Sequence, residues 1–324
     1  MTRRNILHSL LALPGLLLAC AVGAQTYPAK PIRIVVAFAP GGPNDILARI
    51  VGQKLIEQWG QNVIIENRGG AGGTIGMELA SKAPADGYTL SMGSSSNLAA
   101  APSLYPKLGY DPLRDFAPVS NVAFAPYVVT VNPGVPVKNM KELIALARSK
   151  KGLLSYGSSG SGSVSSLMTE ILKSATGTDI VQVPYKGTAP AVTDVIAGQI
   201  DMMIADYAVV APHAKNGKLR MLAVAGAKRS TVAPELPTVA ESGVKGYAVD
   251  AWFGLVTPAG VPREIIDKLN SGVVAGLKSA DVKQRFETLG YEAVGDTPEQ
   301  FGATIKADIA KFAKVIKSAG IKAE

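Results

Sequence analysis

The chain has 324 residues and a formal net charge of +8, and it is 47% hydrophobic and 18% charged. That length is too great for one ordinary core, so two domains are predicted, and the composition is typical of a globular protein. Basic residues are scattered rather than collected in runs, which argues against a nucleic-acid-binding stripe and suits small anionic partners.

The start of the chain has the pattern of an export signal. Arg3 and Arg4 form a positive n-region, residues 9–22 form a short apolar run, and residues 22–24 are the small residues that precede cleavage. The run is too short to favour a permanent membrane span. We therefore predict a signal peptide over 1–24, and the remaining chain carries a charge of +6 because the signal contains two arginines and no acid.

Two features of the signal leave alternatives open. The paired arginines resemble a twin-arginine signal, whereas the leucine-rich run suits general secretion. Cys20 is the only cysteine, and Leu17-Leu18-Ala19-Cys20 resembles a lipoprotein cleavage box, so anchoring through a lipidated Cys20 is a second reading. Without a pair of cysteines there is no disulfide, and the fold must depend on its core.

Past residue 30, short β-branched runs alternate with helical stretches. Strands are predicted at 32–38, 63–66, 89–93, 127–131, 154–157, 180–183, 201–204, 221–224 and 252–256. Helices are predicted at 45–58, 138–148, 164–174, 188–197, 263–277, 281–289 and 298–318. This alternation indicates an α/β architecture built on parallel sheets.

The order of these elements suggests two lobes. Strand, glycine loop and helix follow one another before Pro126 and again after it, and a further strand with three helices closes the chain. Such a returning tail predicts crossovers near Pro126 and Asp250, with a cleft between the lobes. The first lobe is expected to comprise 25–126 and 250–324, and the second 127–249.

Four loops rich in glycine, serine or asparagine follow predicted strands. They span 40–45, 67–74, 93–97 and 157–163, and all but the third open clearly into a helix. At the carboxyl ends of parallel strands, the N–H groups of such loops and helix starts point into a crevice and can bind an anion without a cationic side chain. One such loop is as well explained by a turn, but four at equivalent places predict a binding cleft.

The common catalytic and metal-binding motifs are missing. No Walker lysine follows Gly42 or Gly162, and neither G-x-G-x-x-G nor G-x-S-x-G occurs. His213 is the only histidine after the signal, so a serine triad or a transition-metal site would have almost no ligands. We therefore predict no catalytic residue, no metal and no cofactor.

Three polar residues at strand ends are candidates for helix capping or ligand binding. Thr188 is expected to cap the helix that starts there. Asp45 and Asp206, one in each block, suit either a helix-dipole partner or an acceptor for a ligand amine or hydroxyl, or a contact across the cleft.

Several segments, taken together and in order, resemble the Bug family, the periplasmic solute-binding proteins of tripartite tricarboxylate transporters. They are FAPGGPNDILAR, ENRGGAGGTIG, GSSSNLAAAPSLY, YGSSGSGS, VPYKGTAPAVTDVIAGQIDMM, APELPTVAESG and AWFGLVTPAG. The resemblance covers the whole chain after the signal. It implies an α/β, two-lobed periplasmic-binding-protein fold (type II, clam-shell), a periplasmic location and a monomer.

The resemblance also implies the ligand and where it binds. The ligand class is a small carboxylate, either a di- or tricarboxylate, an acidic or amide amino acid, or an aromatic acid. The first-lobe contacts fall on Pro40, Gly41, Gly42, Pro43, Asn44, Asp45, Thr74, Ser94, Ser95 and Asn97, and the second-lobe contacts on Ser158, Ser159, Ser163, Thr188 and Asp206. Asn44 and Ser166 depart from the threonine and histidine common in the family, which bears on ligand identity.

The implied function is an exported receptor that closes around a carboxylate and delivers it to membrane transporter subunits. A ligand sensor for a membrane kinase needs the same closing shell, and loss of uptake in a deletion strain would separate the two. An exported enzyme acting on organic acids is the other rival. The scarcity of histidine and cysteine counts against it, and turnover of a bound acid would support it.

Overall fold

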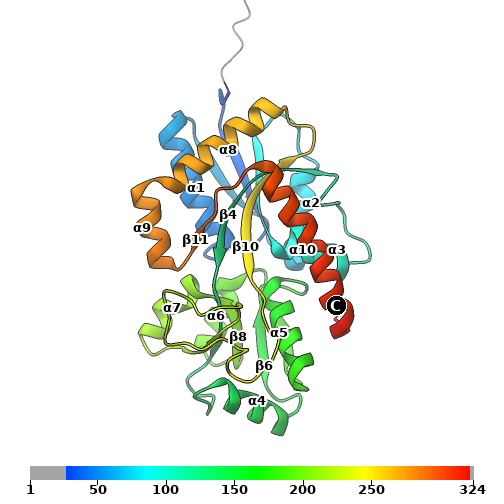
Figure 1. Cartoon of the computed structure of the whole chain (residues 1–324), viewed down its shortest axis with the longest axis vertical. Helices are drawn as coiled ribbons and strands as arrows, with labels where there is room; N and C mark the ends of the chain where they lie inside the picture. Colours follow the sequence, from blue (N-terminus) through cyan, green and yellow to red (C-terminus); the bar gives the residue numbers. More distant parts are fainter. Residues whose placement is uncertain (1–26, 322–324) are drawn as a thin grey trace, which may run out of the picture.

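Two separate β-sheets organise the described chain, residues 27–321 of this computed structural model, into an upper and a lower lobe in Figure 1. The predicted signal peptide 1–24, including Cys20, lies outside the described residues. No helix among those residues is both long and apolar enough to cross a membrane.

The upper sheet has six strands in the order β11-β4-β10-β3-β1-β2. Their bounds are β1 (Ile32–Val36), β2 (Val63–Asn67), β3 (Thr89–Ser94), β4 (Phe116–Ala125), β10 (Ala251–Pro258) and β11 (Glu292–Ala293). β1 pairs in parallel with β2 and β3, whereas β10 is antiparallel to β3 and to β4. The expectation of parallel sheets is therefore wrong. The chain leaves this lobe along β4 and returns along the neighbouring β10, so these two strands run in opposite directions.

The lower sheet has five strands in the order β7-β6-β8-β5-β9. Their bounds are β5 (Tyr127–Val131), β6 (Ser155–Ser158), β7 (Val181–Pro184), β8 (Met202–Asp206) and β9 (Arg220–Val224). β6 is parallel to β7 and β8, and β5 is antiparallel to β8 and β9.

The strand directions bring one set of strand ends to the boundary between the lobes. β4 runs into Pro126 and β5 runs away from it, while β10 starts opposite the end of β4, with Ala251 paired to Ala125. Since β3 is antiparallel to β10 and β8 is antiparallel to β5, the strands β1, β2, β3, β6, β7 and β8 all end at this boundary.

Each of these six strands leads through a loop into a helical segment. In the upper lobe these are α1 (Pro43–Trp59), η1 (Ala71–Gly73) with α2 (Thr74–Ser81), and η2 (Ser95–Ala100) with α3 (Ala101–Leu104); in the lower lobe they are α5 (Val164–Thr176), α6 (Thr188–Ile196) and α7 (Tyr207–Lys215). The other helices are α4 (Met140–Ser149), α8 (Arg263–Lys278), α9 (Ala280–Leu289) and α10 (Pro298–Ala319). In Figure 1, α10 descends along the upper lobe, and it packs against η2, α3 and also α5 of the lower lobe.

The sequence of helix α1 determines which face is buried and where the helix starts and ends. Leu47, Val51 and Leu55 recur four residues apart and are buried on one face. Pro43 occupies the first turn, where a missing N–H is harmless, and Gly60 ends the helix in the left-handed conformation at φ 66°. The start of α1 is thereby fixed next to the loop that follows β1.

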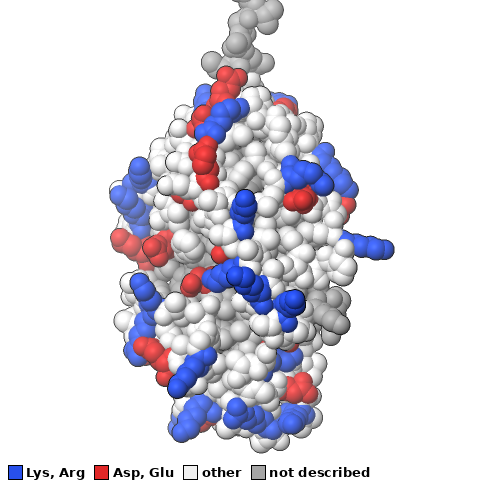
Figure 2. All heavy atoms as spheres, turned by 45° about the vertical axis from the view of Figure 1, so that its right-hand side comes forward, with Lys and Arg blue, Asp and Glu red and all other residues white. Residues whose placement is uncertain are grey.

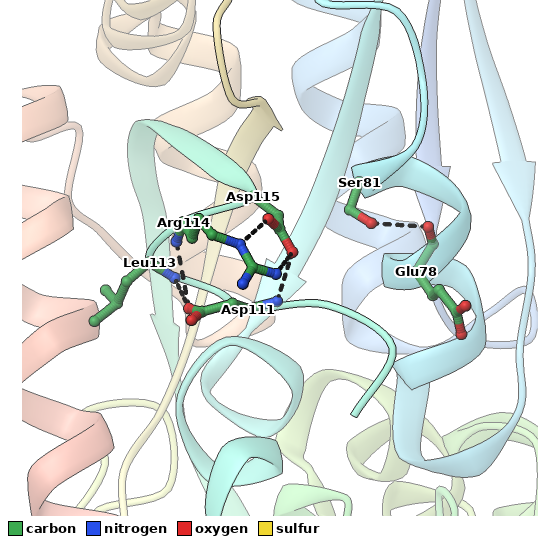
Figure 3. A network of polar contacts seen from close by, with 6 residues as sticks. All are labelled: Glu78, Ser81, Asp111, Leu113, Arg114 and Asp115. Atoms are coloured by element: carbon green, nitrogen blue, oxygen red, sulfur yellow. Dashed lines mark hydrogen bonds and ion pairs between the residues drawn. The ribbon is translucent and has the colours of Figure 1, made fainter. Parts of the chain in front are cut away.

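The connection between α3 and β4, residues 105–115, is held by two aspartates (Figure 3). Asp111 Oδ1 accepts from the Leu113 N–H at 2.9 Å, and Asp115 Oδ2 accepts from the Asp111 N–H at 2.8 Å. This segment carries Tyr105, which reaches the lower lobe.

Some elements of the structure were not predicted. β4, β11, α3 and α7 are additions, and the loop 93–97, which was not expected to lead clearly into a helix, opens into the π-helical segment η2. On the face that Figure 2 shows, lysine and arginine side chains are distributed over both lobes among acidic ones. That distribution matches the scattered charge of the sequence.

Candidate functional site

Helix starts from both lobes surround the boundary. The first turns of α1, α2 and η2 face those of α5, α6 and α7 there, because all six follow strands that end at this boundary. Unpaired N–H groups and the positive end of the helix dipole favour an anion at such places. No lysine or arginine is buried in the described part of the chain, so the backbone supplies the positive potential inside.

Hydrogen bonds join the two lobes across this boundary. They run from the Ala39 N–H to the Lys186 carbonyl oxygen at 2.8 Å, from the Val164 N–H to the Ser96 hydroxyl at 2.7 Å, and from the Tyr105 hydroxyl to the Ser161 carbonyl oxygen. The loops of the two lobes are therefore in direct contact, and the structure represents a closed arrangement.

Close backbone approach explains two of the glycines in these loops. A β-carbon on Gly72 would lie 2.5 Å from the Ser161 carbonyl oxygen, and Gly72 also has φ +61°. A β-carbon on Gly187 would lie 2.9 Å from the Ala39 nitrogen, although its φ of 163° is ordinary extended backbone. Any side chain at Gly187 would thus obstruct the closed arrangement without straining its own backbone.

Asp45 braces the loop that follows β1. Its Oδ2 accepts from the Gly41 N–H at 3.0 Å and from Arg49 Nε at 2.9 Å. Its Oδ1 accepts from Asn67 Nδ2 at 3.0 Å and from a second Arg49 nitrogen at 3.0 Å. Burial alone would raise the pKa of Asp45, but these donors outweigh burial and lower it. Both oxygens are occupied, so Asp45 positions the loop and offers no free acceptor to a ligand amine.

The other residues predicted in the first two loops differ in position. Pro40 and Gly41 are exposed, whereas Gly42, Pro43 and Asn44 are buried. The Asn44 amide donates to the Met92 carbonyl oxygen at 3.0 Å.

Thr74 and Thr188 also begin helices but face different surroundings. The Thr74 hydroxyl donates to the Ala71 carbonyl oxygen at 2.9 Å and is partly exposed, so it is tied to its own turn. The expectation that Thr188 caps α6 is wrong, because Gly187 is the N-cap residue and no side chain caps this helix. Thr188 is the buried first residue of α6, and its Cβ would lie 3.7 Å from a β-carbon on Gly42 of the other lobe.

The loop after β3 contains three buried polar groups without a hydrogen-bond partner in the described chain. They are Ser94 Oγ, Ser95 Oγ and Asn97 Nδ2. The other amide atom of Asn97, Oδ1, accepts from the Ser94 N–H at 2.9 Å, which fixes the side chain. An unpartnered buried polar group costs about 1–3 kcal/mol, so three of them at one strand end indicate a place for a ligand acceptor.

The serine loop of the lower lobe is internally bonded. Ser165 Oγ lies 3.0 Å from Ser159 Oγ and 3.0 Å from Ser163 Oγ. Ser158 Oγ accepts from Gln182 Nε2 at 2.8 Å. The structure therefore brings the predicted Ser158, Ser159 and Ser163 together, and it adds Ser165 and Gln182, which sequence reasoning missed.

Asp206 is buried where β8 meets the upper lobe. The Tyr291 hydroxyl of that lobe donates to Asp206 Oδ1 at 3.1 Å, and Oδ2 has no partner in the described chain. Burial raises the pKa of Asp206 to about 7, and the Tyr291 hydroxyl with the first N–H groups of α7 opposes that rise. Asp206 therefore contacts the opposite lobe.

Neither a metal cluster nor a histidine-based centre is found in the part of the chain that the structure describes. No group of three or more His, Cys, Asp or Glu side chains there could hold a metal ion. His213 lies in the last turn of α7, at the end of that helix remote from the boundary. The chemistry that the boundary offers is hydrogen bonding to an anion.

Residues 47–321 match the TctC family, described as the tripartite tricarboxylate transporter family receptor. Protein BugT of Bordetella pertussis is 38% identical, over 97% of this chain and 98% of its own.

Two solved structures are similar over nearly the whole chain. R. palustris Rpa4515 with adipate is 38% identical with a TM-score of 0.89, covering 91% of this chain and 99% of its own. MatC (Rpa3494) from Rhodopseudomonas palustris with bound malate is 33% identical with a TM-score of 0.87, covering 90% and 100%. The two-lobed periplasmic-binding-protein fold predicted from the sequence is confirmed. The chain belongs to the receptor family of the tripartite tricarboxylate transporters.

Proposed function

We propose that this receptor binds a small carboxylate between its lobes and delivers it to a membrane transporter. The observation that carries the proposal is the group of unpartnered buried atoms on Ser94, Ser95 and Asn97, set among helix starts of both lobes. Neutral donors and helix dipoles suit a carboxylate, whose charge strengthens each hydrogen bond. The adipate and malate found with Rpa4515 and MatC support this ligand class.

The arrangement of donors favours a dicarboxylate. Ser94, Ser95 and Asn97 would hold one carboxylate from the upper lobe, and the serine loop at the start of α5 would hold the other from the lower lobe. The ligand would then bridge the lobes and stabilise the closed arrangement. When Asp206 is ionised, its Oδ2 is an acceptor, so a ligand hydroxyl or ammonium would suit it better than a third carboxylate.

The two crossovers at Pro126 and Asp250 are the natural hinge in this proposal. Residues 25–126 with 250–324 would move as one lobe and 127–249 as the other. Ligand would enter when the lobes separate and be enclosed when the loops meet, as in other clam-shell receptors.

We further propose that the chain works as a monomer in the periplasm and does not transform its ligand. A serine with a neighbouring base is the usual arrangement for covalent catalysis. Ser165 of α5 is hydrogen-bonded to other serines and Ser166 of α5 to Gln182, while His213 is at the remote end of α7.

A thermal-shift panel tests the proposal. The chain without residues 1–24 is melted with mono-, di- and tricarboxylates, and each acid that raises the melting temperature is recovered and analysed. Ligand at 100 times its Kd adds about 2.7 kcal/mol, which is several degrees for a chain of this size. Dicarboxylates recovered unchanged are expected; turnover would indicate an enzyme. No shift from any carboxylate, in protein shown to be free of ligand, would contradict the proposal.

The variant Gly42→Val connects the binding to the loop after β1. A β-carbon at Gly42 would meet Thr188 at ordinary contact distance, so the methyl groups of valine would press on Thr188 only when the lobes close. We expect the variant to lose the ligand-induced shift while the melting temperature of the free protein stays close to that of the wild type. Uptake by a deletion strain, with and without the gene, then separates a transport receptor from a sensor.

A further inference from the structure

An apolar hollow lies at the boundary and belongs to both lobes. Its volume is about 760 Å³. The upper lobe contributes Ala71, Ile75 and Tyr105 to the lining, and the lower lobe contributes Pro184, Tyr185 and Pro190. Neither lobe forms this hollow alone.

Large apolar side chains beside the hollow are exposed. Ile75 and Leu79 lie one turn apart on α2, and they are 55% and 38% exposed. Clustered exposed apolar residues on a globular protein mark interaction surfaces more often than single ones do. Figure 3 shows α2, with Glu78 and Ser81, beside the 105–115 connection, and a β-carbon on Gly109 of that connection would collide with the Glu78 carboxylate.

The hollow depends on the closed arrangement. Tyr105 crosses to the Ser161 carbonyl oxygen, and a β-carbon on Gly69 would lie 2.7 Å from the Lys186 carbonyl oxygen. The hydrogen bond holds the two rims together, and Gly69 marks a second place where their backbones approach closely. When the lobes separate, Ile75 and Tyr185 move apart, and the hollow loses one wall.

Lys186 lines the hollow, and Lys107 follows the lining residue Tyr105 by two positions. Lys107 and Lys186 are exposed and form no ion pair within the described residues. Acids on the neighbouring segments are already engaged: Glu66 pairs with Arg68, Glu78 pairs with Lys82, and Asp194 accepts from the Tyr185 hydroxyl. A partner that fits this surface would therefore present an apolar side chain flanked by carboxylates.

We propose that a periplasmic segment of the membrane transporter, apolar and flanked by acidic residues, docks on this surface, which we name the rim patch (Ile75, Leu79, Tyr105, Tyr185 and Lys186). The assignment rests on the proposed function, since it requires a receptor that hands its ligand to a membrane partner. Because only the closed receptor completes the rim patch, the transporter distinguishes a loaded receptor from an open one by surface shape, without contacting the ligand.

The test compares Ile75→Ser with Ile64→Ser. Ile64 on β2 is 54% exposed, almost the same as Ile75, but lies outside the rim patch, so both variants remove one exposed isoleucine. Binding of malate and adipate is measured on purified protein, and uptake of whichever acid binds is measured in a deletion strain carrying each variant. We expect Ile75→Ser to keep its Kd within twofold and to lose at least tenfold in uptake, while Ile64→Ser keeps both.

The outcomes separate the two proposals. If the wild type binds no carboxylate, the proposed function fails before the rim patch is tested. If the wild type binds and Ile75→Ser supports normal uptake, the rim patch is overturned and the proposed function stands. Loss of ligand binding by Ile75→Ser would also overturn the assignment, because Ile75 would then act in closure.

A charge reversal and the oligomeric state add independent checks. Lys107→Glu should lower uptake several-fold at unchanged Kd, and unchanged or increased uptake would contradict an acidic partner. If the wild type dimerises in solution and Ile75→Ser is monomeric, the rim patch is a self-association surface and the transporter assignment is wrong.

Discussion

Ser95 and Ser165 are both fully buried serines at strand ends or helix starts, one in each lobe, and they differ in their partners. Ser165 Oγ lies 3.0 Å from two other serine hydroxyls, whereas Ser95 Oγ has no partner in the described chain. A buried hydroxyl left without a hydrogen bond destabilises the free protein, and a ligand oxygen can compensate for it. Ser95 is therefore suited to binding and Ser165 to holding its loop.

Replacing Ser95 with alanine should act in opposite directions on stability and affinity. The free protein should gain about 1 kcal/mol of unfolding free energy, because an unsatisfied buried group is removed. Carboxylate affinity should fall roughly tenfold or more, because a hydrogen bond to a charged acceptor is lost. Urea titration and calorimetric binding measure the two effects, with Ser165→Ala as the control that should lower stability. Reduced stability with unchanged affinity would exclude Ser95 from the site.

Asp206 predicts a pH dependence of stability. Its pKa rises from 3.8 to about 7 on burial, so the folded protein holds a proton that the unfolded chain releases between these values. The contribution of Asp206 is fully present below pH 3.8 and is lost as pH rises through about 7, by at most roughly 4 kcal/mol. The facing hydroxyls of Tyr127 and Tyr291 have pKa values raised well above this range, so they do not titrate there.

The variant Asp206→Asn isolates this effect. Asparagine keeps an acceptor for Tyr291 and cannot ionise, so the variant should match the wild type near pH 4 and exceed its unfolding free energy at pH 8. Urea titrations across this interval give the difference. If the unfolding free energies of the two proteins changed equally with pH, Asp206 would not be the group with the raised pKa.

Local sequence signals do not separate Asp45 from Asp206. Each is an acid where a strand ends and a helix begins, yet four donor groups surround Asp45 and Asp206 is buried with one side-chain donor. Gln182 and Tyr291 gave no signal either, because their contacts depend on strand order and on how the lobes pack. The position of the glycine and serine loops between strand ends and helix starts was predictable, since residue type marks such turns.

At the scale of elements, apolar periodicity located nearly every strand that leads into the boundary but missed elements interrupted by polar residues or proline. β4 contains Pro118, Ser120 and Asn121, and its pairing with β10 shifts register twice. α7 contains Pro212 inside the helix. Strand direction was also unpredictable, because it is decided by which chain segments cross between the lobes and not by local pattern.

Close contact at the start of α6 should limit how far the two lobes can close. Gly187→Ala leaves the backbone unstrained, because its φ of 163° suits any residue, but the methyl group would lie 2.9 Å from the Ala39 nitrogen when the lobes meet. We expect carboxylate affinity to fall about tenfold while the free protein melts within about 1 °C of the wild type.

Gly302→Ala in α10 is the matched control for Gly187→Ala. A β-carbon there meets Pro118 Cγ at 3.4 Å, and alanine favours the helix interior, so affinity should be unchanged and stability slightly higher. If Gly187→Ala binds as tightly as the wild type, the contact between Gly187 and Ala39 is not part of the bound state.

At the scale of the whole molecule, affinity is set by two separable quantities. One is the intrinsic affinity of the closed receptor for the ligand. The other is the fraction of receptor that is closed, and the apparent affinity is the product of the two. The chain order made the two lobes predictable, since a tail returning after the second block requires two crossovers. The hydrogen bonds that hold the lobes together were not predictable, because they join main-chain groups brought together only by closure.

Tyr105→Phe tests this separation. The variant removes the hydroxyl that donates to the Ser161 carbonyl oxygen and keeps the ring that lies against Gly162. One such bond is worth about 0.5–1.5 kcal/mol, so the equilibrium constant for closure, and with it the apparent affinity, should fall about two- to tenfold. Because Tyr105 acts on closure, the same factor should apply to malate, to adipate and to any other ligand measured by calorimetry. Ser95→Ala should instead change affinities by factors that differ among ligands. A factor for Tyr105→Phe that varied with the ligand would place its hydroxyl in contact with the bound acid and would contradict a role in closure alone.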